Sequence, residues 1–113
     1  MSDARDQRQS RRISELKPTF ITLKGHAFRV NDISNDGMGL ILDAGGPQLV
    51  MGQRLDQIPI PLESGTIHIR GIVTHISVTE DATVCGIRFL FSGDQHQWIL
   101  KFKQEIRQPP EDA

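Results

Sequence analysis

Arginines cluster at the start of this chain. Four of its nine arginines lie within the first twelve residues, and three of these, Arg8, Arg11 and Arg12, are closely spaced. A guanidinium group can bind phosphate oxygens, or the O6 and N7 atoms of guanine, through two parallel hydrogen bonds. Because residues 1–12 contain no large apolar side chain after Met1, we expect a flexible arm that could close over an anion. A solvated basic tail is the alternative interpretation.

A second polar cluster occupies residues 31–39, where Asn, Asp, Ser and Gly residues predict a loop. Asp32 and Ser34 would place a carboxylate and a hydroxyl at the end of a strand, facing outward. A carboxylate can accept hydrogen bonds from the N–H groups on the Watson–Crick edge of guanine. The alternative is a structural turn, in which Asp32 and Ser34 bond the local backbone and the glycines adopt positive φ angles.

Patterns for catalysis or metal binding are weak in the rest of the chain. The aspartates within residues 32–43 lack calcium-loop spacing, no glycine-rich phosphate loop is present, and Cys85 is predicted to be a buried core thiol. We interpret His68 and His75 as partly buried or solvated strand side chains. No histidine has the spacing of a helical zinc motif or a neighbouring nucleophile pattern: His26, His68, His75 and His96. The sequence therefore favours a binding protein with no catalytic activity, metal or cofactor.

Most of the secondary-structure elements that the sequence predicts are short strands, and these must position the polar residues. Strand patterns cover residues 19–24, 27–33, 38–43, 58–62, 66–79 and 85–91. We expect a hairpin turn at Gly25–His26 and a β-bulge at Gly71, where the apolar phase of the longest strand shifts. Pro59 and Pro61 cannot donate to a ladder, so residues 58–62 are predicted to form an edge strand or to lie beside a bulge.

The periodicity becomes helical after residue 92. Ser92 and Gln95 are predicted to form a capping box, and Pro109–Pro110 to end the helix. Four apolar residues form its stripe: Trp98, Ile99, Phe102 and Ile106. These elements predict an all-β fold, a small antiparallel barrel with one terminal helix, whose stripe packs on the barrel or serves a partner.

Composition narrows the class of protein. The chain has 113 residues, a net charge of −1 and one cysteine, which excludes an internal disulfide framework. Because no global basic field exists, DNA binding is not expected. No apolar run approaches the roughly 20 residues that span a bilayer, so no membrane insertion is expected. The polar N-terminus lacks the apolar core of a signal peptide, and we expect a cytoplasmic domain.

Together the two polar segments resemble the PilZ domain, a bacterial receptor for cyclic di-GMP. The family pattern is R-x-x-x-R on an N-terminal arm, followed after a gap by [D/N]-x-S-x-x-G. Here these motifs are Arg8-Gln9-Ser10-Arg11-Arg12 and Asp32-Ile33-Ser34-Asn35-Asp36-Gly37. Late in the chain, Cys85-Gly86-Ile87-Arg88-Phe89 resembles the C-G-x-x-F strand common in these domains. The resemblance covers about Arg8 to Ile106, and departs from the family where residues 14–18 separate the arm from the first strand.

The resemblance implies a six-stranded antiparallel barrel with a C-terminal helix over residues 13–107, a flexible arm over 1–12 and a disordered tail over 108–113. Arg8 and Arg12 would bind phosphate and guanine edges, with Arg11 as a third contact that the motif does not require. Asp32 and Ser34 would hold a guanine by hydrogen bonds, and Gly37 would let the loop turn beneath it. The implied ligand-binding set has six members: Arg8, Arg11, Arg12, Asp32, Ser34 and Gly37.

The implied function is a cyclic di-GMP receptor that relays its signal to an unidentified downstream protein, by ligand-induced ordering of the arm. Motility, exopolysaccharide production or virulence would be the output. One alternative is a PilZ-type adaptor that binds protein and no nucleotide, which the intact motif disfavours. The other is a small barrel that binds single-stranded RNA through strand aromatics, for which Phe20 and Phe28 are the candidates.

Overall fold

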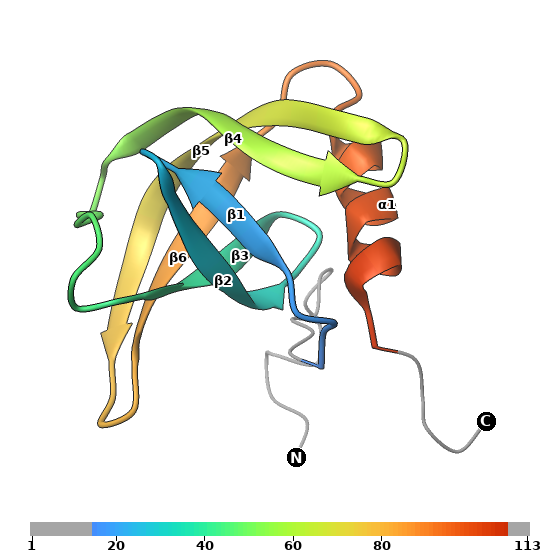
Figure 1. The fold of residues 1–113 in the computed structure, drawn as a ribbon. Coiled ribbons are helices and arrows are strands. Elements are labelled where there is room, and N and C mark those ends of the chain that lie inside the picture. The colour runs from blue at the N-terminus through green and yellow to red at the C-terminus, as the bar shows by residue number, and fades with distance from the viewer. Residues whose placement is uncertain (1–14, 109–113) are drawn as a thin grey trace, which may run out of the picture.

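The computed structural model describes residues 15–108, so the predicted arm with its arginines, and Pro109–Pro110, lie outside the described residues. Six strands and one helix follow in chain order (Figure 1): β1 (Phe20–Leu23), β2 (His26–Ile33), β3 (Gly37–Leu42), β4 (Arg54–Leu62), β5 (Gly65–Val78), β6 (Thr83–Leu90) and α1 (His96–Ile106). The predicted all-β fold with a C-terminal helix is confirmed.

The strands form one antiparallel sheet in the order β1-β2-β3-β6-β5-β4. The sheet curls until β1 faces β4 across a seam, which nearly closes the barrel (Figure 1). Within residues 15–108, no hydrogen-bonded ladder joins these two strands. β4 is therefore an edge strand, as Pro59 and Pro61 predicted.

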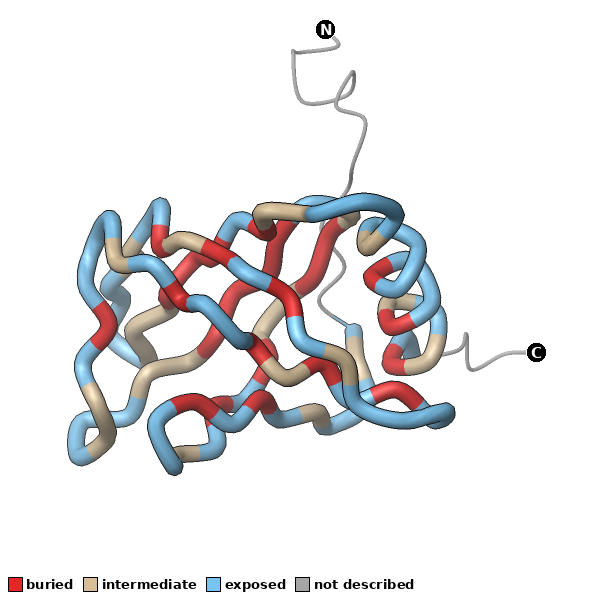
Figure 2. Tube along the Cα trace, turned by 90° about the horizontal axis from the view of Figure 1, so that it is seen from above, coloured by how far each residue is buried: buried red, intermediate tan, exposed pale blue. Residues whose placement is uncertain are grey.

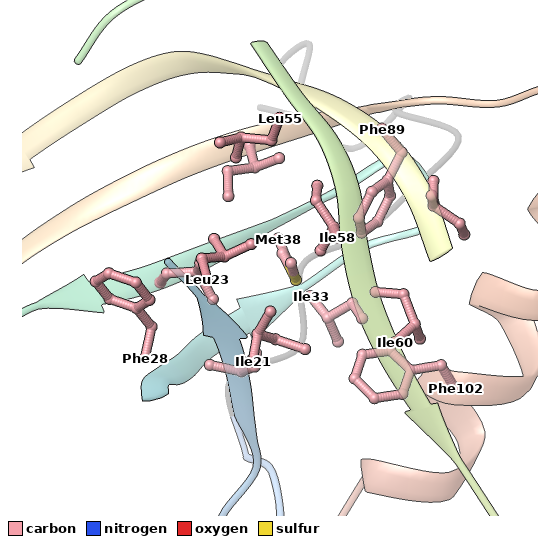
Figure 3. Close-up of a cluster of buried hydrophobic side chains, with 14 of the residues drawn as sticks. Ile21, Leu23, Phe28, Ile33, Met38, Leu55, Ile58, Ile60, Phe89 and Phe102 are labelled. Carbon is pink, nitrogen blue, oxygen red and sulfur yellow. The ribbon is translucent and has the colours of Figure 1, made fainter. Parts of the chain in front are cut away.

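Side chains from every strand fill the barrel. Alternate residues are buried at the end of β4, as Ile58, Ile60 and Leu62 show, whereas the central strand β3 is buried on both faces over Gly37–Leu40 (Figure 2). Figure 3 shows that Phe102 of α1 lies beside Ile60, so the helix contributes to the same core. Full burial of one such side chain stabilises a fold by about 1.5–3 kcal/mol. The barrel therefore holds the outer face of its strands in a fixed geometry.

The helix differs in two ways from its prediction. Trp98 is 41% exposed, and the stripe that packs on the barrel consists of Ile99, Phe102 and Ile106. The predicted capping box is wrong, because the helix begins at His96 and Ser92 does not cap it. Gln95 Oε1 accepts a hydrogen bond from Ser92 N–H (2.8 Å), but the Ser92 hydroxyl accepts one from Arg70 Nη2 (3.0 Å).

Two further predictions were displaced by a few residues. The first hairpin turns at Lys24–Gly25, with φ angles of 54° and 77°, and His26 already pairs with Leu23 in the ladder. Two positive φ angles are typical of the tight turn that matches the twist of a hairpin. Against β6, the bulge of β5 lies between Val73 and His75, and Gly71 is in regular register. Against β4, Gly71 pairs with Leu55 and lies beside a second irregularity, where the register shifts between Leu55 and Ile58.

The residues that precede β1 are attached to the end of α1. Leu16 forms an antiparallel bridge with Arg107, and Lys17 N–H donates to the carbonyl of Ile106 (2.8 Å). Gln108 N–H donates to Glu15 O (2.9 Å), so the pairing continues on both sides of the bridge. Residues 14–18, which depart from the family pattern, therefore include a segment that joins the two ends of the described chain.

Candidate functional site

The motif residues lie on a tight β2–β3 hairpin. The sequence predicted a loop over residues 31–39, but only residues 34–36 lie between the strands. The ladder continues into the motif, because Asp32 pairs with Gly39 and Ile33 pairs with Met38. Buried Ile33 lies between polar Asp32 and Ser34, and buried Met38 lies between two glycines, so this sequence is compatible with strand ends as well as with a loop. The motif is therefore rigidly held by the sheet.

Ser34 lies inside this turn. Its side chain is 2% exposed, and its hydroxyl lies 2.9 Å from Asp36 Oδ1 and 3.3 Å from the carbonyl oxygen of Gly37. Ser34 N–H also donates to that carbonyl (2.9 Å). These contacts are those of a turn-forming serine. In the structure the hydroxyl thus faces the hairpin rather than outward.

Gly37 is required by close packing. Its φ is not positive, contrary to the interpretation of the glycines as left-handed turn residues. A Cβ at Gly37 would overlap the carbonyl oxygen of Ile87 on the neighbouring strand. Next to it, Phe89 N–H donates to the carbonyl of Asp36 (2.9 Å), which fastens the turn to β6.

Asp32 lies on the outer face of the barrel, at the edge of a cavity of about 280 Å³. Asn31 Nδ2 donates to Asp32 Oδ2 (2.7 Å), which orients the carboxylate. The cavity lies over four neighbouring strands and is lined by Asn31, Asp32, Gly39, Thr74, His75, Ser77, Val84 and Gly86. Asp32 is therefore the residue of the second motif that lines this cavity.

The floor of this cavity is a pair of glycines. Gly39 and Gly86 are direct partners in the β3–β6 ladder. A Cβ at Gly39 would lie 2.6 Å from Asp32 Oδ2, and one at Gly86 would lie 3.2 Å from the Cβ of His75. The cross-strand pairing extends to the next strand on each side, since Asp32 of β2 pairs with Gly39 and His75 of β5 pairs with Gly86. Asp32, Gly39, Gly86 and His75 thus form one row across β2, β3, β6 and β5.

Asp32 was predicted from the sequence as a binding residue, whereas Gly39, Gly86 and His75 were not. Gly86 belongs to the C-G-x-x-F segment, so that resemblance was the available signal for it. His75 carried no such signal, because a single histidine in a strand pattern does not reveal which face it occupies. Arg8, Arg11 and Arg12 lie outside the described residues, so their place relative to the cavity is not defined by the structure.

The thiol of Cys85 and the metal-binding potential of the described residues can be assessed directly. Cys85 is fully buried, and burial raises the pKa of its thiol from 9.0 to about 11, which disfavours the reactive thiolate. This confirms the predicted core thiol. Among residues 15–108 there is no group of three or more His, Cys, Asp or Glu side chains that could hold a metal ion. In the same range, no helix is long and apolar enough to cross a membrane.

The fold and cavity define a small β-barrel domain with a polar site on its outer surface. The family model for the PilZ domain matches residues 6–108. Because this match covers most of the sequence, the chain belongs to the PilZ domain family. No curated protein matches the chain.

Solved structures share this fold. The PilZ domain of YcgR from Escherichia coli with c-di-GMP is 22% identical, with a TM-score of 0.66, over 88% of this chain and 91% of that one. YcgR from Escherichia coli in complex with c-di-GMP is 27% identical, with a TM-score of 0.66, over 88% of this chain and 45% of that one. The MrkH–c-di-GMP complex of K. pneumonia is 21% identical, with a TM-score of 0.66, over 87% of this chain and 51% of that one. This chain spans about half the length of the last two.

Proposed function

We propose that this chain is a receptor for cyclic di-GMP that acts without catalysis. The observation that carries the proposal is the position of Asp32, whose motif is intact and whose carboxylate lies beside a concave surface with a glycine floor. Membership of the PilZ family and the cyclic di-GMP complexes of YcgR and MrkH support the choice of ligand. A flat purine can approach the backbone closely where no Cβ intervenes.

Each candidate residue has a proposed role. The Asp32 carboxylate accepts hydrogen bonds from the N–H groups of a guanine, while Ser34 and Gly37 hold the hairpin that presents it. Arg8, Arg11 and Arg12 bind phosphate oxygens or the O6/N7 edge of guanine with their guanidinium groups. Thr19 O accepts a hydrogen bond from Val30 N–H (2.9 Å), so the described chain enters the barrel beside β2, the strand that carries Asp32.

The output of the receptor is proposed to depend on the arm. Residues 1–12 would become ordered when ligand phosphates supply the counter-charge for the arginines. The changed surface beside the β2–β3 hairpin would then be read by a downstream protein in the cytoplasm, in motility, exopolysaccharide production or virulence. Backbone amide relaxation of residues 5–12, measured with and without cyclic di-GMP, tests this step. Equal order in both states would contradict it while leaving binding intact.

Calorimetric titration of the purified chain tests the binding itself. We expect cyclic di-GMP to bind at least tenfold more tightly than cyclic di-AMP, because adenine presents an N6 donor where guanine presents the O6 acceptor. Asp32→Ala should weaken binding of cyclic di-GMP by at least tenfold. Asp56→Ala, at an exposed carboxylate on β4, is the matched control and should leave binding unchanged. No binding of cyclic di-GMP by the unaltered chain would overturn the proposal.

The two alternatives are less well supported. Phe28 is fully buried, so of the two aromatic candidates for RNA binding only Phe20, which is 51% exposed, is on the surface. One exposed aromatic does not provide the successive stacking platforms that single-stranded RNA requires. A PilZ-type adaptor without nucleotide would show no heat of binding in the titration above, which separates it from the receptor.

A further inference from the structure

Two β-bulges flank the glycine floor, one on each side. In β2, Phe28 and Val30 face the core, and the register to β3 shifts between Val30 and Asp32. In β5, Ile69 and Val73 face the core, and the register to β6 shifts between Val73 and His75. The bulged residues, Asn31 and Thr74, both line the cavity.

Each bulge redirects the side chain that follows it. Successive strand residues face opposite sides, so a regular β2 would point Asp32 into the core after Val30, and a regular β5 would do the same to His75 after Val73. One inserted residue reverses this. As a result, Asp32 and His75 both lie on the outer face, at opposite ends of the row that contains Gly39 and Gly86. A bulge immediately before each residue thus turns both side chains to the outer face of the barrel.

We propose that His75 is a second ligand-binding residue of this site, and that its imidazole ring stacks on a guanine base lying over the Gly39–Gly86 floor. This inference rests on the proposed function, since that ligand supplies the base. Asp32 then recognises the polar edge of the guanine, and His75 contacts its planar face. Asp32 is the other titratable side chain among the described residues that line the cavity.

The surroundings of His75 favour stacking. Its side chain is exposed, and its Cβ lies 3.2 Å from where a Gly86 Cβ would be, so the ring begins at the edge of the floor. Among the described residues, no hydrogen bond or ion pair occupies its ring nitrogens, in contrast to His26, whose Nε2 lies 3.2 Å from Asp43 Oδ2. Stacking of a base on an aromatic side chain contributes about 1–3 kcal/mol to binding.

Three substitutions at one position separate stacking from hydrogen bonding. His75→Ala removes both, His75→Phe keeps the aromatic face, and His75→Gln keeps polar atoms without a ring. In calorimetric titrations with cyclic di-GMP we expect about tenfold weaker binding for Ala and Gln, and a change of less than about threefold for Phe, tenfold being about 1.4 kcal/mol. Because His75 is exposed, the melting temperatures without ligand should stay close to that of the unaltered chain.

His68→Ala is the matched control. His68 is also an exposed histidine on β5, but it pairs with Pro59 and does not line the cavity. Its removal should leave binding unchanged. Unchanged binding for His75→Ala would overturn this inference and leave the proposed function intact. If His75→Gln retains binding and His75→Phe loses it, the stacking role is overturned. No binding by the unaltered chain would overturn both this inference and the proposed function.

Discussion

Lys103 of α1 donates a hydrogen bond to Asn35 in the turn between β2 and β3, with 2.5 Å between Nζ and Oδ1. Burial, and to a lesser extent the positive charge of Arg107, lower the pKa of this lysine. The contact joins residues 68 positions apart in the sequence. It gives the helix a direct attachment to the hairpin that carries Asp32.

This contact should be measurable as a coupling free energy. Asn35→Ala and Lys103→Met should each lower the free energy of unfolding by about 0.5–1.5 kcal/mol, and the double variant by less than the sum of the two. Urea unfolding of the unaltered chain, the two single variants and the double variant gives the double-mutant cycle. Lys101→Met, at an exposed position of the same helix, should show no coupling to Asn35→Ala. Additive effects of Asn35→Ala and Lys103→Met would contradict an energetic link.

Arg12→Ala is expected to affect binding and not folding. Loss of a charge-assisted contact should weaken cyclic di-GMP binding by about 1.5–3 kcal/mol. The melting temperature without ligand should hardly change, because residues 1–12 contain no large apolar side chain after Met1. Calorimetric titration and thermal melting of the same sample measure both quantities. Unfolding of the variant without ligand would show that Arg12 is structural.

Ser34→Ala is expected to lower stability. The hydroxyl is buried and contacts Asp36 and Gly37 O, so its removal should reduce the free energy of unfolding by about 0.5–1.5 kcal/mol. Urea unfolding measures this cost, and Ser77→Ala on β5 serves as a control because Ser77 is less buried. Binding that weakens with no loss of stability would instead indicate that the hydroxyl contacts the ligand directly.

Gly71→Ala is expected to destabilise the barrel. A Cβ at this position would lie 2.8 Å from Ile58 Cδ1, 2.9 Å from Ile87 Cγ2 and 3.1 Å from the carbonyl oxygen of Arg88. Such overpacking usually costs about 1–3 kcal/mol. At Gly45 a Cβ would meet nothing within 4 Å, so Gly45→Ala is the control. Equal urea midpoints for the two variants would show that the barrel relaxes around the added methyl group.

Cys85 makes stability depend on pH in the alkaline range. Burial raises its pKa from 9.0 to about 11, so the folded chain keeps the thiol proton to higher pH than the unfolded chain does. This contribution to stability is fully present below pH 9 and is lost as the pH rises towards 11. The urea midpoint should therefore fall more steeply over this range for the unaltered chain than for Cys85→Ala. Parallel curves would place the thiol in solvent.

The strands and the core were largely predictable, because alternation of apolar residues is a local signal. Cys85, Ile87 and Phe89 alternate with Gly86, Arg88 and Leu90 and are buried as predicted. Asp32 was found because its motif is contiguous in the sequence. The helix end was less predictable, since Ser92 accepts a hydrogen bond from Arg70, which is 22 residues away.

The positions of the bulges could not be predicted in the same way. Ile72 and Ile76 suggested a phase change at Gly71, but Ile72 is only partly buried on the outer face and Val73 keeps the inward register. A bulge depends on the partner strand, here on how His75 pairs with Gly86. The row from Asp32 to His75 therefore becomes visible only when four strands are aligned in space.

The open seam between β1 and β4 has a mechanical consequence. β1 is joined by a ladder to β2 alone, and across the seam it is held by side-chain packing such as that of Ile21 (Figure 3). Parting the barrel there breaks no interstrand ladder within residues 15–108, whereas parting it anywhere else breaks a whole ladder. The seam is thus the line along which sub-global opening costs least, and β1 moves away from β4 there while it stays paired with β2.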